Sequence, residues 1–142
     1  MKEMTEAEYK RFLIEGTKTG KIATVKKDGS PHVVPIWFDL VNGNIVFTTG
    51  GDSVKAKNMR RDPRVCLTVD DQTPPYAFVQ IEGIASFSDD LKEMLRWATR
   101  IGGRYMGEDQ AEAFGKRNSV PGELLVRIRP AKVIAYKDLA GW

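Results

Sequence analysis

Apolar and polar positions alternate over much of the chain, in a pattern typical of short strands joined by turns. Residues 21–26, 33–40 and 45–49 are β-rich runs. Asp28-Gly29 and Asn42-Gly43 separate these runs, and both dipeptides favour the positive φ angles of tight hairpin turns. The pattern therefore predicts three strands in meander order.

The spacing of apolar residues becomes helical at four places. Thr5-x-x-Glu8 is a capping-box sequence, in which two side chains satisfy free backbone amides. Ser53 is a good N-cap, and the residue before Pro63 resists helical geometry. We expect helices over residues 5–16, 53–62, 89–107 and 109–116. In the third of these, the spacing predicts one face formed by Leu91, Leu95, Ala98, Ile101 and Tyr105.

The remaining apolar runs predict strands over residues 65–69, 76–87, 123–128 and 131–136. Gly83 suggests a bend or bulge within the longest strand, and Pro130 interrupts the last two. The sequence has no internal repeat and no linker. We therefore expect one domain over residues 1–142, mainly β with flanking helices, with six or seven strands and three or four helices.

Composition narrows the class of protein. The chain is 42% apolar and 29% charged, which is typical of a globular protein. No apolar run approaches the roughly 20 residues that span a bilayer, and the polar N-terminal sequence has no signal-peptide core. Cys66 is the single cysteine, which excludes an internal disulfide. We expect a cytoplasmic protein that does not act at a membrane.

The basic charge is concentrated in one segment. Residues 52–64 contain five Lys or Arg and two Asp, so their net charge equals the +3 of the whole chain. This excess is too small to indicate nucleic-acid binding. Basic and aromatic residues also do not alternate along one strand face, as a nucleic-acid-binding barrel requires.

The same segment has features of a phosphate site. A strand ends at Thr48-Thr49, Gly50-Gly51 follow, and a helix begins at Ser53. Helix N-termini present free amides that suit phosphate, and Lys55 and Lys57 add positive charge. There is no Walker sequence. The alternative interpretation is a glycine turn before a solvated basic helix.

A second feature is the proline within an otherwise strong strand, at Pro35. Proline cannot donate to a strand ladder, so this position is an edge, a bulge or a backbone surface that faces a ligand. An apolar strand of this kind suits a planar ring. An edge strand without a ligand is the alternative.

Three segments resemble one protein family. They are residues 28–38, which read DGSPHVVPIWF; residues 53–65, with Ser53-x-Lys55-x-Lys57-Asn58; and residues 80–85, QIEGIA. In order and spacing they resemble the FMN-binding split-barrel proteins, the superfamily of pyridoxamine 5′-phosphate oxidase. Within it the chain is most similar to the small oxidoreductases that depend on coenzyme F420. The resemblance implies a split β-barrel and a homodimer with cofactor at the subunit interface.

The resemblance also implies a cofactor site. It places the ring against the strand of His32, Val34, Pro35 and Ile36. It places the phosphate on Thr49, Ser53 and Lys55, with Thr48, Gly50, Lys57 and Asn58 lining the same pocket, and Tyr76 or Phe78 of a partner subunit closing it. The only histidine, His32, then contacts the ring rather than acting as an acid.

The chain departs from pyridoxamine-phosphate oxidases in ways that bear on the cofactor. His32, Trp37 and Val54 stand where those enzymes have arginine, lysine and arginine, and the C-terminal residues that hold the vitamin phosphate have no counterpart. F420 continues beyond its phosphate into a tail with several carboxylates, which needs a basic track. Such a track is available in Lys57, Arg60, Arg61 and Arg64. F420 is therefore favoured, with FMN as the alternative.

These expectations point to an oxidoreductase that transfers a hydride between reduced F420 and a small electron-poor substrate. The cofactor supplies such chemistry, so no catalytic side chain is required, and no metal-ligand spacing or nucleophile triad is present in the sequence. A non-catalytic carrier of deazaflavin or flavin is the alternative. We interpret Cys66, Trp37, Trp97 and Trp142 as core or interface residues.

Overall fold

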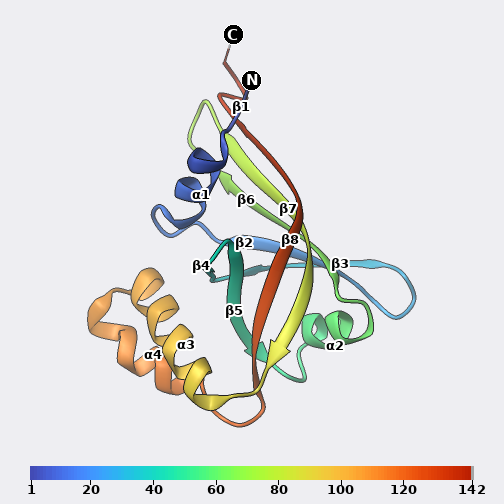
Figure 1. Cartoon of the computed structure of the whole chain (residues 1–142), viewed down its shortest axis with the longest axis vertical. Helices are drawn as coiled ribbons and strands as arrows, with labels where there is room; N and C mark the ends of the chain where they lie inside the picture. The colour runs from blue at the N-terminus through green and yellow to red at the C-terminus, as the bar shows by residue number, and fades with distance from the viewer. Residues whose placement is uncertain (142) are drawn as a thin grey trace.

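An antiparallel sheet of eight strands forms most of the computed structural model, which describes residues 1–141 (Figure 1). Trp142 lies outside the described residues. The strand order is β3-β2-β6-β7-β8-β5-β4, and β1 pairs with β8. The strands are β1 (Lys2–Glu3), β2 (Gly20–Val25), β3 (Pro31–Ile36), β4 (Asp39–Val41), β5 (Asn44–Gly50), β6 (Arg64–Asp71), β7 (Ala77–Ser88) and β8 (Glu123–Lys137).

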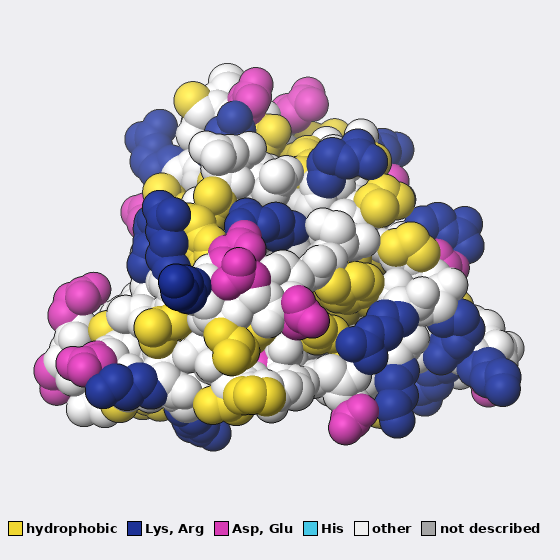
Figure 2. Space-filling view, turned by 60° about the horizontal axis from the view of Figure 1, so that its bottom comes forward, with side chains coloured by type: hydrophobic (Ala, Val, Ile, Leu, Met, Phe, Trp, Pro, Cys, Tyr) yellow, Lys and Arg dark blue, Asp and Glu magenta, His cyan; other side chains and the backbone are white. Residues whose placement is uncertain are grey.

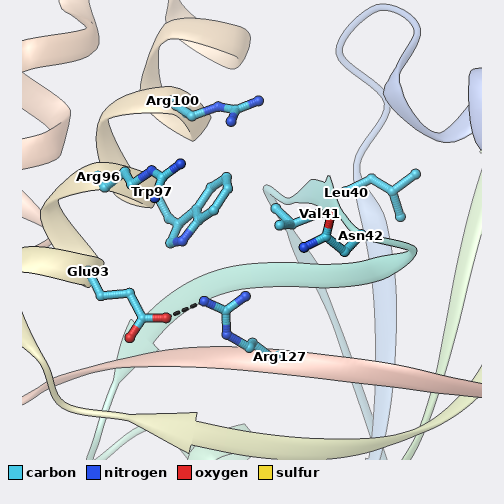
Figure 3. A pocket seen from close by; sticks show the side chains of 8 residues that line it. All are labelled: Leu40, Val41, Asn42, Glu93, Arg96, Trp97, Arg100 and Arg127. Carbon is cyan, nitrogen blue, oxygen red and sulfur yellow. Dashed lines mark hydrogen bonds and ion pairs between the residues drawn. The ribbon is translucent and has the colours of Figure 1, made fainter.

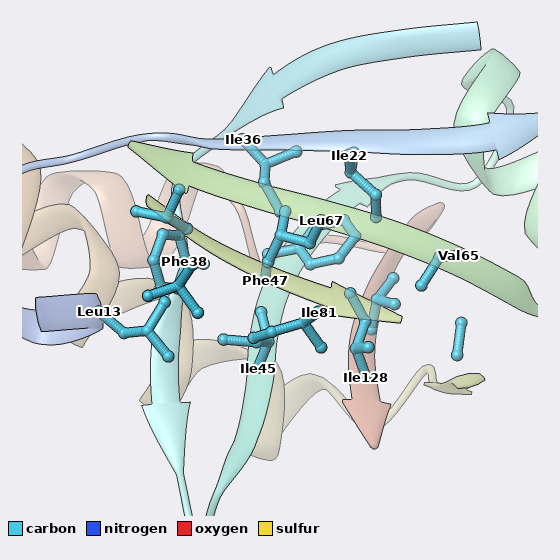
Figure 4. Packing of buried hydrophobic residues seen from close by; sticks show 14 of the residues in the cluster. Leu13, Ile22, Ile36, Phe38, Ile45, Phe47, Val65, Leu67, Ile81 and Ile128 are labelled. Atoms are coloured by element: carbon cyan, nitrogen blue, oxygen red, sulfur yellow. The ribbon is translucent and has the colours of Figure 1, made fainter. Parts of the chain in front are cut away.

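The sheet curls into an open barrel. β3 and β4 lie at opposite ends of the strand order, yet only Trp37 and Phe38 separate them in the chain. The two ends must therefore approach each other, although they do not pair. The interior is filled by large apolar side chains (Figure 4), among them Ile22, Phe38, Ile45, Phe47, Leu67, Ile81 and Ile128. The prediction of a mainly β fold with flanking helices is confirmed.

The predicted three-strand meander is wrong in its middle strand, although the pairings across both predicted hairpin turns are present. Residues 33–40 do not form one strand, because the chain leaves β3 after Ile36 and pairs again only from Asp39. The backbone turns at Phe38, whose side chain is fully buried in the barrel. β3 then pairs only with β2, and β4 only with β5. Pro35 accordingly lies on an edge strand, which is one of the three placements that the sequence left open.

The last two predicted strands are one strand, β8, which runs through Pro130. Opposite it, the register of β7 shifts between Glu82 and Gly83, so Ala131 is an extra residue in β8. A bulge tolerates the missing amide of proline. The predicted bulge at Gly83 is confirmed, and it explains why Pro130 does not end the strand.

The helices begin near the predicted caps. They are α1 (Glu6–Ile14), α2 (Val54–Arg61), α3 (Leu91–Met106) and α4 (Ala111–Arg117), with a short 3₁₀ turn, η1 (Glu108–Gln110). Thr5 and Glu8 form the complete capping box at α1. Figure 1 shows α3 and α4 together on one side of the sheet, with α2 on the other side, after the C-terminal end of β5.

The predicted buried face of α3 is partly wrong. Ala98 and Ile101 are buried, but Leu91 and Leu95 are exposed. Met94 and Trp97 are buried in their place, because a small second core under α3 packs them against Val46 of β5 and Leu125 of β8. Helical spacing alone does not determine which of two apolar stripes meets the sheet.

Within the described residues, the structure contains no helix that is both long and apolar enough to cross a membrane.

Candidate functional site

A cavity of about 250 Å³ lies where β3 ends beside β5, α2 and α3. It brings together four residues that the sequence predicts for the site, namely Pro35, Ile36, Thr48 and Lys55. Its other lining residues are Trp37, Ala98, Ile101 and Asn118. Segments that are far apart in the sequence therefore meet around one small space, with an apolar wall from β3 and α3 and a cation from α2.

The turn before α2 is held by hydroxyl groups. Ser53 is the N-cap, and its Oγ accepts from the amide of Ala56 at 3.2 Å. The same oxygen lies 3.0 Å from Oγ1 of Thr49, which is buried at the end of β5. These two predicted phosphate ligands are thus bonded to each other and fix where the helix begins. Gly50 lies between them, and a Cβ there would meet nothing within 4 Å.

The second glycine of the turn, Gly51, is required by a close contact between two backbone segments. The amide of Gly51 donates to the carbonyl oxygen of Gly122 at 2.7 Å, and a Cβ on Gly51 would lie 2.9 Å from that oxygen. The close approach that requires glycine here is therefore to the loop before β8. The sequence suggested a close approach to a ligand, and the structure gives Gly51 a different neighbour.

Lys55 is the cation of the cavity. It lies in the first turn of α2 and is half-buried. Burial lowers the pKa of its ammonium group, and the nearby carboxylate of Glu123 partly offsets this shift. A partly desolvated ammonium attracts an anion more strongly than a solvated one does. Among the described residues, Lys55 is the one titratable side chain that lines this cavity.

The other predicted residues of α2 lie away from the cavity. Lys57 is exposed. Asn58 is only 3% exposed, and its amide donates to Oγ1 of Thr24 on β2 at 3.0 Å, which attaches the helix to the sheet. Arg61 donates to the carbonyl oxygen of Val25 at 3.1 Å. Asn58 and Arg61 therefore hold α2 in place.

Some side chains of the predicted basic track form hydrogen bonds or ion pairs with neighbouring residues. Arg60 donates to the carbonyl oxygen of Gly51 at 3.2 Å, and Arg64 forms an ion pair with Asp62 at 2.7 Å. Figure 2 shows Lys and Arg side chains gathered on the side of the molecule that carries α2 and the β2–β3 hairpin. Positive charge is therefore concentrated beside the cavity, and the side chain of Lys57 has no ion pair or hydrogen bond among residues 1–141.

The predicted ring-binding strand has two different faces. His32 and Val34 pair with Thr24 and Ile22 of β2 and share the inward face of the sheet, whereas Pro35 is exposed. Nδ1 of His32 is buried and has no hydrogen-bond partner within the described chain. An unpaired buried polar atom is costly, so His32 has unused hydrogen-bonding capacity in the strand next to the cavity.

Sequence reasoning missed the residues that complete the cavity. The sequence indicates a core or interface role for Trp37, but this residue lines the cavity and stacks on Tyr105 of α3, with ring centroids 5.3 Å apart. The hydroxyl of Tyr105 donates to the carbonyl oxygen of Lys18 at 2.7 Å. The position of Trp37 directly after the ring-binding strand was a usable signal. No local pattern could have identified Ala98, Ile101 or Asn118.

An open antiparallel barrel with a half-buried lysine beside its edge strand defines a split-barrel protein with a cationic cavity. A family model described as "Pyridoxamine 5'-phosphate oxidase" matches residues 5–137, and the chain belongs to this family. The predicted split barrel is thereby confirmed. No curated protein matches the chain at a significant level.

Several solved structures share the fold. A conserved hypothetical protein of Mycobacterium tuberculosis, Rv2991, is 29% identical with a TM-score of 0.84, covering 95% of this chain and 86% of its own. An F420 reductase is 23% identical with a TM-score of 0.64, covering 87% and 94%. The heme storage protein HutZ of Vibrio cholerae is 19% identical with a TM-score of 0.72, covering 95% and 97%. Proteins with different activities therefore share this fold.

Proposed function

We propose that the protein is an oxidoreductase that binds coenzyme F420 at the cavity and transfers a hydride between the reduced coenzyme and a small electron-poor substrate. The observation that carries the proposal is the half-buried ammonium group of Lys55 in a cavity that also contains Thr48 and the edge strand. The residues present fit a phosphorylated planar cofactor, because the cavity lining offers a cation to the phosphate and an apolar wall to the ring.

The phosphate end would be held by Lys55 and Thr48. Lys55 supplies a full charge from the first turn of α2, where the free backbone amides also favour an anion. Burial removes part of the hydration of the ammonium group, and a bound phosphate would compensate for this loss through its negative charge. Thr49 and Ser53 keep this turn in position through the hydrogen bond between their hydroxyls.

The ring would lie along β3, beside Pro35 and Ile36. Pro35 has no amide and so presents an apolar edge, and Trp37 closes one side of the cavity with its own ring held by Tyr105. His32 would contact the ring edge at the far end of this strand, although its Nδ1, which lacks a partner in the described chain, does not line the cavity of one chain. Val34 supports this strand from the inward face.

When bound, the deazaflavin supplies the hydride, and the protein supplies orientation and an apolar surrounding. Ala98 and Ile101 of α3 exclude water from one side of the cavity. Lys55 is positioned for binding, and we assign no side chain of this chain to proton transfer. The proton would come from solvent.

We further propose a homodimer in which a second copy completes the site. The cavity is smaller than the ~300–1,000 Å³ of typical small-molecule sites, so one chain encloses only part of a cofactor. A separate apolar groove of about 570 Å³ lies across β2, β6, β7 and β8, and Arg64 and Glu82 line it. Opposite charges on one patch suit a twofold interface, in which each patch faces its own copy.

F420 is preferred to FMN because positive charge continues past Lys55. Lys57, which has no ion pair or hydrogen bond among residues 1–141, would be available to the carboxylates of a long tail. Arg60, Arg61 and Arg64 add positive charge around it, although each also has a local partner. An FMN-dependent oxidoreductase is the alternative within the same site, and a non-catalytic carrier of either cofactor is another. We propose the cytoplasm as the location, because one cysteine suits a reducing compartment.

Titration of the purified protein with F420 and with FMN, followed by tryptophan fluorescence, tests the proposal. We expect saturable binding that is tighter for F420. Lys55→Gln removes a charge-assisted hydrogen bond worth about 1.5–3 kcal/mol, so it should weaken both cofactors at least tenfold while leaving the barrel folded. Unchanged affinity in this variant would exclude the site.

The matched variant Lys57→Gln separates the two cofactors. Lys57 is exposed, so its contribution is that of a surface pair, at most about 1 kcal/mol. We expect F420 affinity to fall up to about fivefold and FMN affinity to stay within error. Equal losses for both cofactors would contradict the tail argument and leave FMN as the better assignment.

An enzyme and a carrier differ in what happens after binding. Reduced F420 bound to the protein should be oxidised faster by an enone, imine or quinone than free reduced F420 at the same concentration, as measured by the return of its visible absorbance. Rates no faster than in free solution for all three acceptor classes would favour the carrier.

A further inference from the structure

A second cavity, of about 600 Å³, lies between α3 and the β4–β5 hairpin (Figure 3). It shares no lining residue with the proposed cofactor site, although α3 borders both. Three of its lining side chains are arginines and one is acidic. The volume and charge of this cavity indicate a second binding site, and this inference does not rest on the proposed oxidoreductase function.

One arginine of the cavity is already neutralised. Arg127 of β8 forms an ion pair with Glu93 of α3, drawn as the dashed line in Figure 3. Glu93 also accepts from the hydroxyl of Ser88 at 3.2 Å. Both partners of the pair are two-thirds buried, so Arg127 is held at the back of the cavity.

The other two arginines both contact one buried aromatic ring. The guanidinium groups of Arg96 and Arg100 lie 5.1 and 4.9 Å from the ring centroid of Trp97. Trp97 is only 4% exposed and packs into the small core under α3, so the ring is held in place. Like charges four residues apart on a helix repel each other, and an anion between them would offset this repulsion.

Only one of these two cations has a carboxylate partner within the described residues. Nε of Arg100 lies 3.5 Å from the carboxylate of Asp39, at the outer range of an ion pair. Within residues 1–141, no carboxylate lies within ion-pairing distance of Arg96. Figure 3 shows the amide of Asn42 facing α3 from the turn after β4, which adds a neutral hydrogen-bonding group opposite the arginines.

We propose that this cavity binds a small ligand with at least two negatively charged oxygens, as carboxylate or phosphate, between Arg96 and Arg100 on one side and Asn42 on the other. Guanidinium groups bind both oxyanions through paired hydrogen bonds. The volume is within the range of small-molecule sites, and a dianion relieves the repulsion between the two arginines.

Calorimetric titration of the cofactor-free protein with citrate and with pyrophosphate tests the proposal. We expect saturable binding of at least one probe, and an affinity that falls as salt is raised. Binding of citrate alone would assign a carboxylate ligand, and binding of pyrophosphate alone a phosphate ligand. Saturable binding of neither probe would overturn the proposal.

Variants locate the binding. Arg96→Gln/Arg100→Gln should weaken the probe at least tenfold, and Arg96→Gln alone, which removes an exposed side chain, at least threefold. Arg117→Gln is the matched control, because Arg117 also lies over an aromatic ring, that of Phe114, but outside the cavity. Lys55→Gln should have no effect. If Lys55→Gln abolishes binding while the arginine variants retain it, the probe occupies the cofactor site and the proposal fails.

Discussion

Lys55 and Lys57 show how two like residues on one short helix acquire different roles. Two residues correspond to about 200° of rotation around an α-helix, so Lys55 faces the cavity and Lys57 faces solvent. The sequence predicted both as ligands, because spacing in a motif does not show which side of the helix meets the barrel. Burial then gives Lys55 a lowered pKa.

Cofactor affinity should therefore depend on pH through Lys55. The ammonium form binds the phosphate, and burial lowers the pKa of this group from its ordinary value of 10.5. As the pH rises through the lowered pKa, the cation is lost and affinity falls, earlier than for an exposed lysine. Fluorescence titrations between pH 7 and 10 should show this decrease in the wild type and not in Lys55→Gln. Equal pH dependence in the two proteins would argue against Lys55 as the ligand.

Glu8 gives a prediction for acid stability. A hydrogen bond from Lys137 of β8, followed by one from the backbone of Thr5, lowers the pKa of its carboxyl from 4.5 to about 2. The stabilisation is thus complete above pH 4.5 and is lost as the pH falls through about 2. Urea unfolding across pH 2–7 should show that Glu8→Gln removes part of this dependence. Glu3→Gln, an exposed change on β1, should not.

At the scale of elements, local sequence signals predict caps and turns, but they do not predict where strands end. Local signals predicted the capping box of α1, the Ser53 cap and the hairpin turn, where Asn42 and Gly43 have φ angles of 51° and 79°. They did not predict the corner at Trp37 and Phe38, because burial of Phe38 depends on strands elsewhere in the sheet. They also did not predict that residues 123–128 and 131–136 form one strand, β8, because this depends on pairing with β7.

The position on β7 opposite the bulge of β8 requires glycine. A Cβ at Gly83 would lie 2.6 Å from Cγ2 of Ile128 and 2.8 Å from the carbonyl oxygen of Arg129. Gly83→Ala should therefore reduce the free energy of unfolding by about 1–3 kcal/mol, the usual cost of overpacking. Gly50→Ala is the matched control, because its Cβ would meet nothing within 4 Å. Similar stabilities of the two variants in urea would contradict this explanation.

At the scale of the whole molecule, the two walls of the cavity come from distant parts of the sequence. The motifs along residues 28–65 identified the edge strand and the lysine helix, which are close in sequence. The opposite wall, from α3 and the loop after α4, is supplied by residues more than 30 positions further along the chain. Its contribution depends on how the sheet curls, which local patterns do not specify.

The proposed dimer is also a property of the whole molecule. Ile84 lies in the apolar groove beside Gly83. Ile84→Arg should convert the dimer to a monomer in sedimentation experiments and weaken cofactor binding at least tenfold, because the cavity of one chain is incomplete. Ile14→Arg, an equally drastic change at an exposed position of α1, should affect neither. A dimer that persists in Ile84→Arg would place the interface on another face.

A crystal structure of the protein with F420 bound would show directly whether Lys55 holds the cofactor. We expect the cofactor phosphate within about 2.7–3.2 Å of Nζ of Lys55, a hydrogen-bonding distance, with the ring along Pro35 and Ile36. A cofactor bound elsewhere, for example between Arg96 and Arg100, or a phosphate that makes no contact with Lys55, would contradict this expectation.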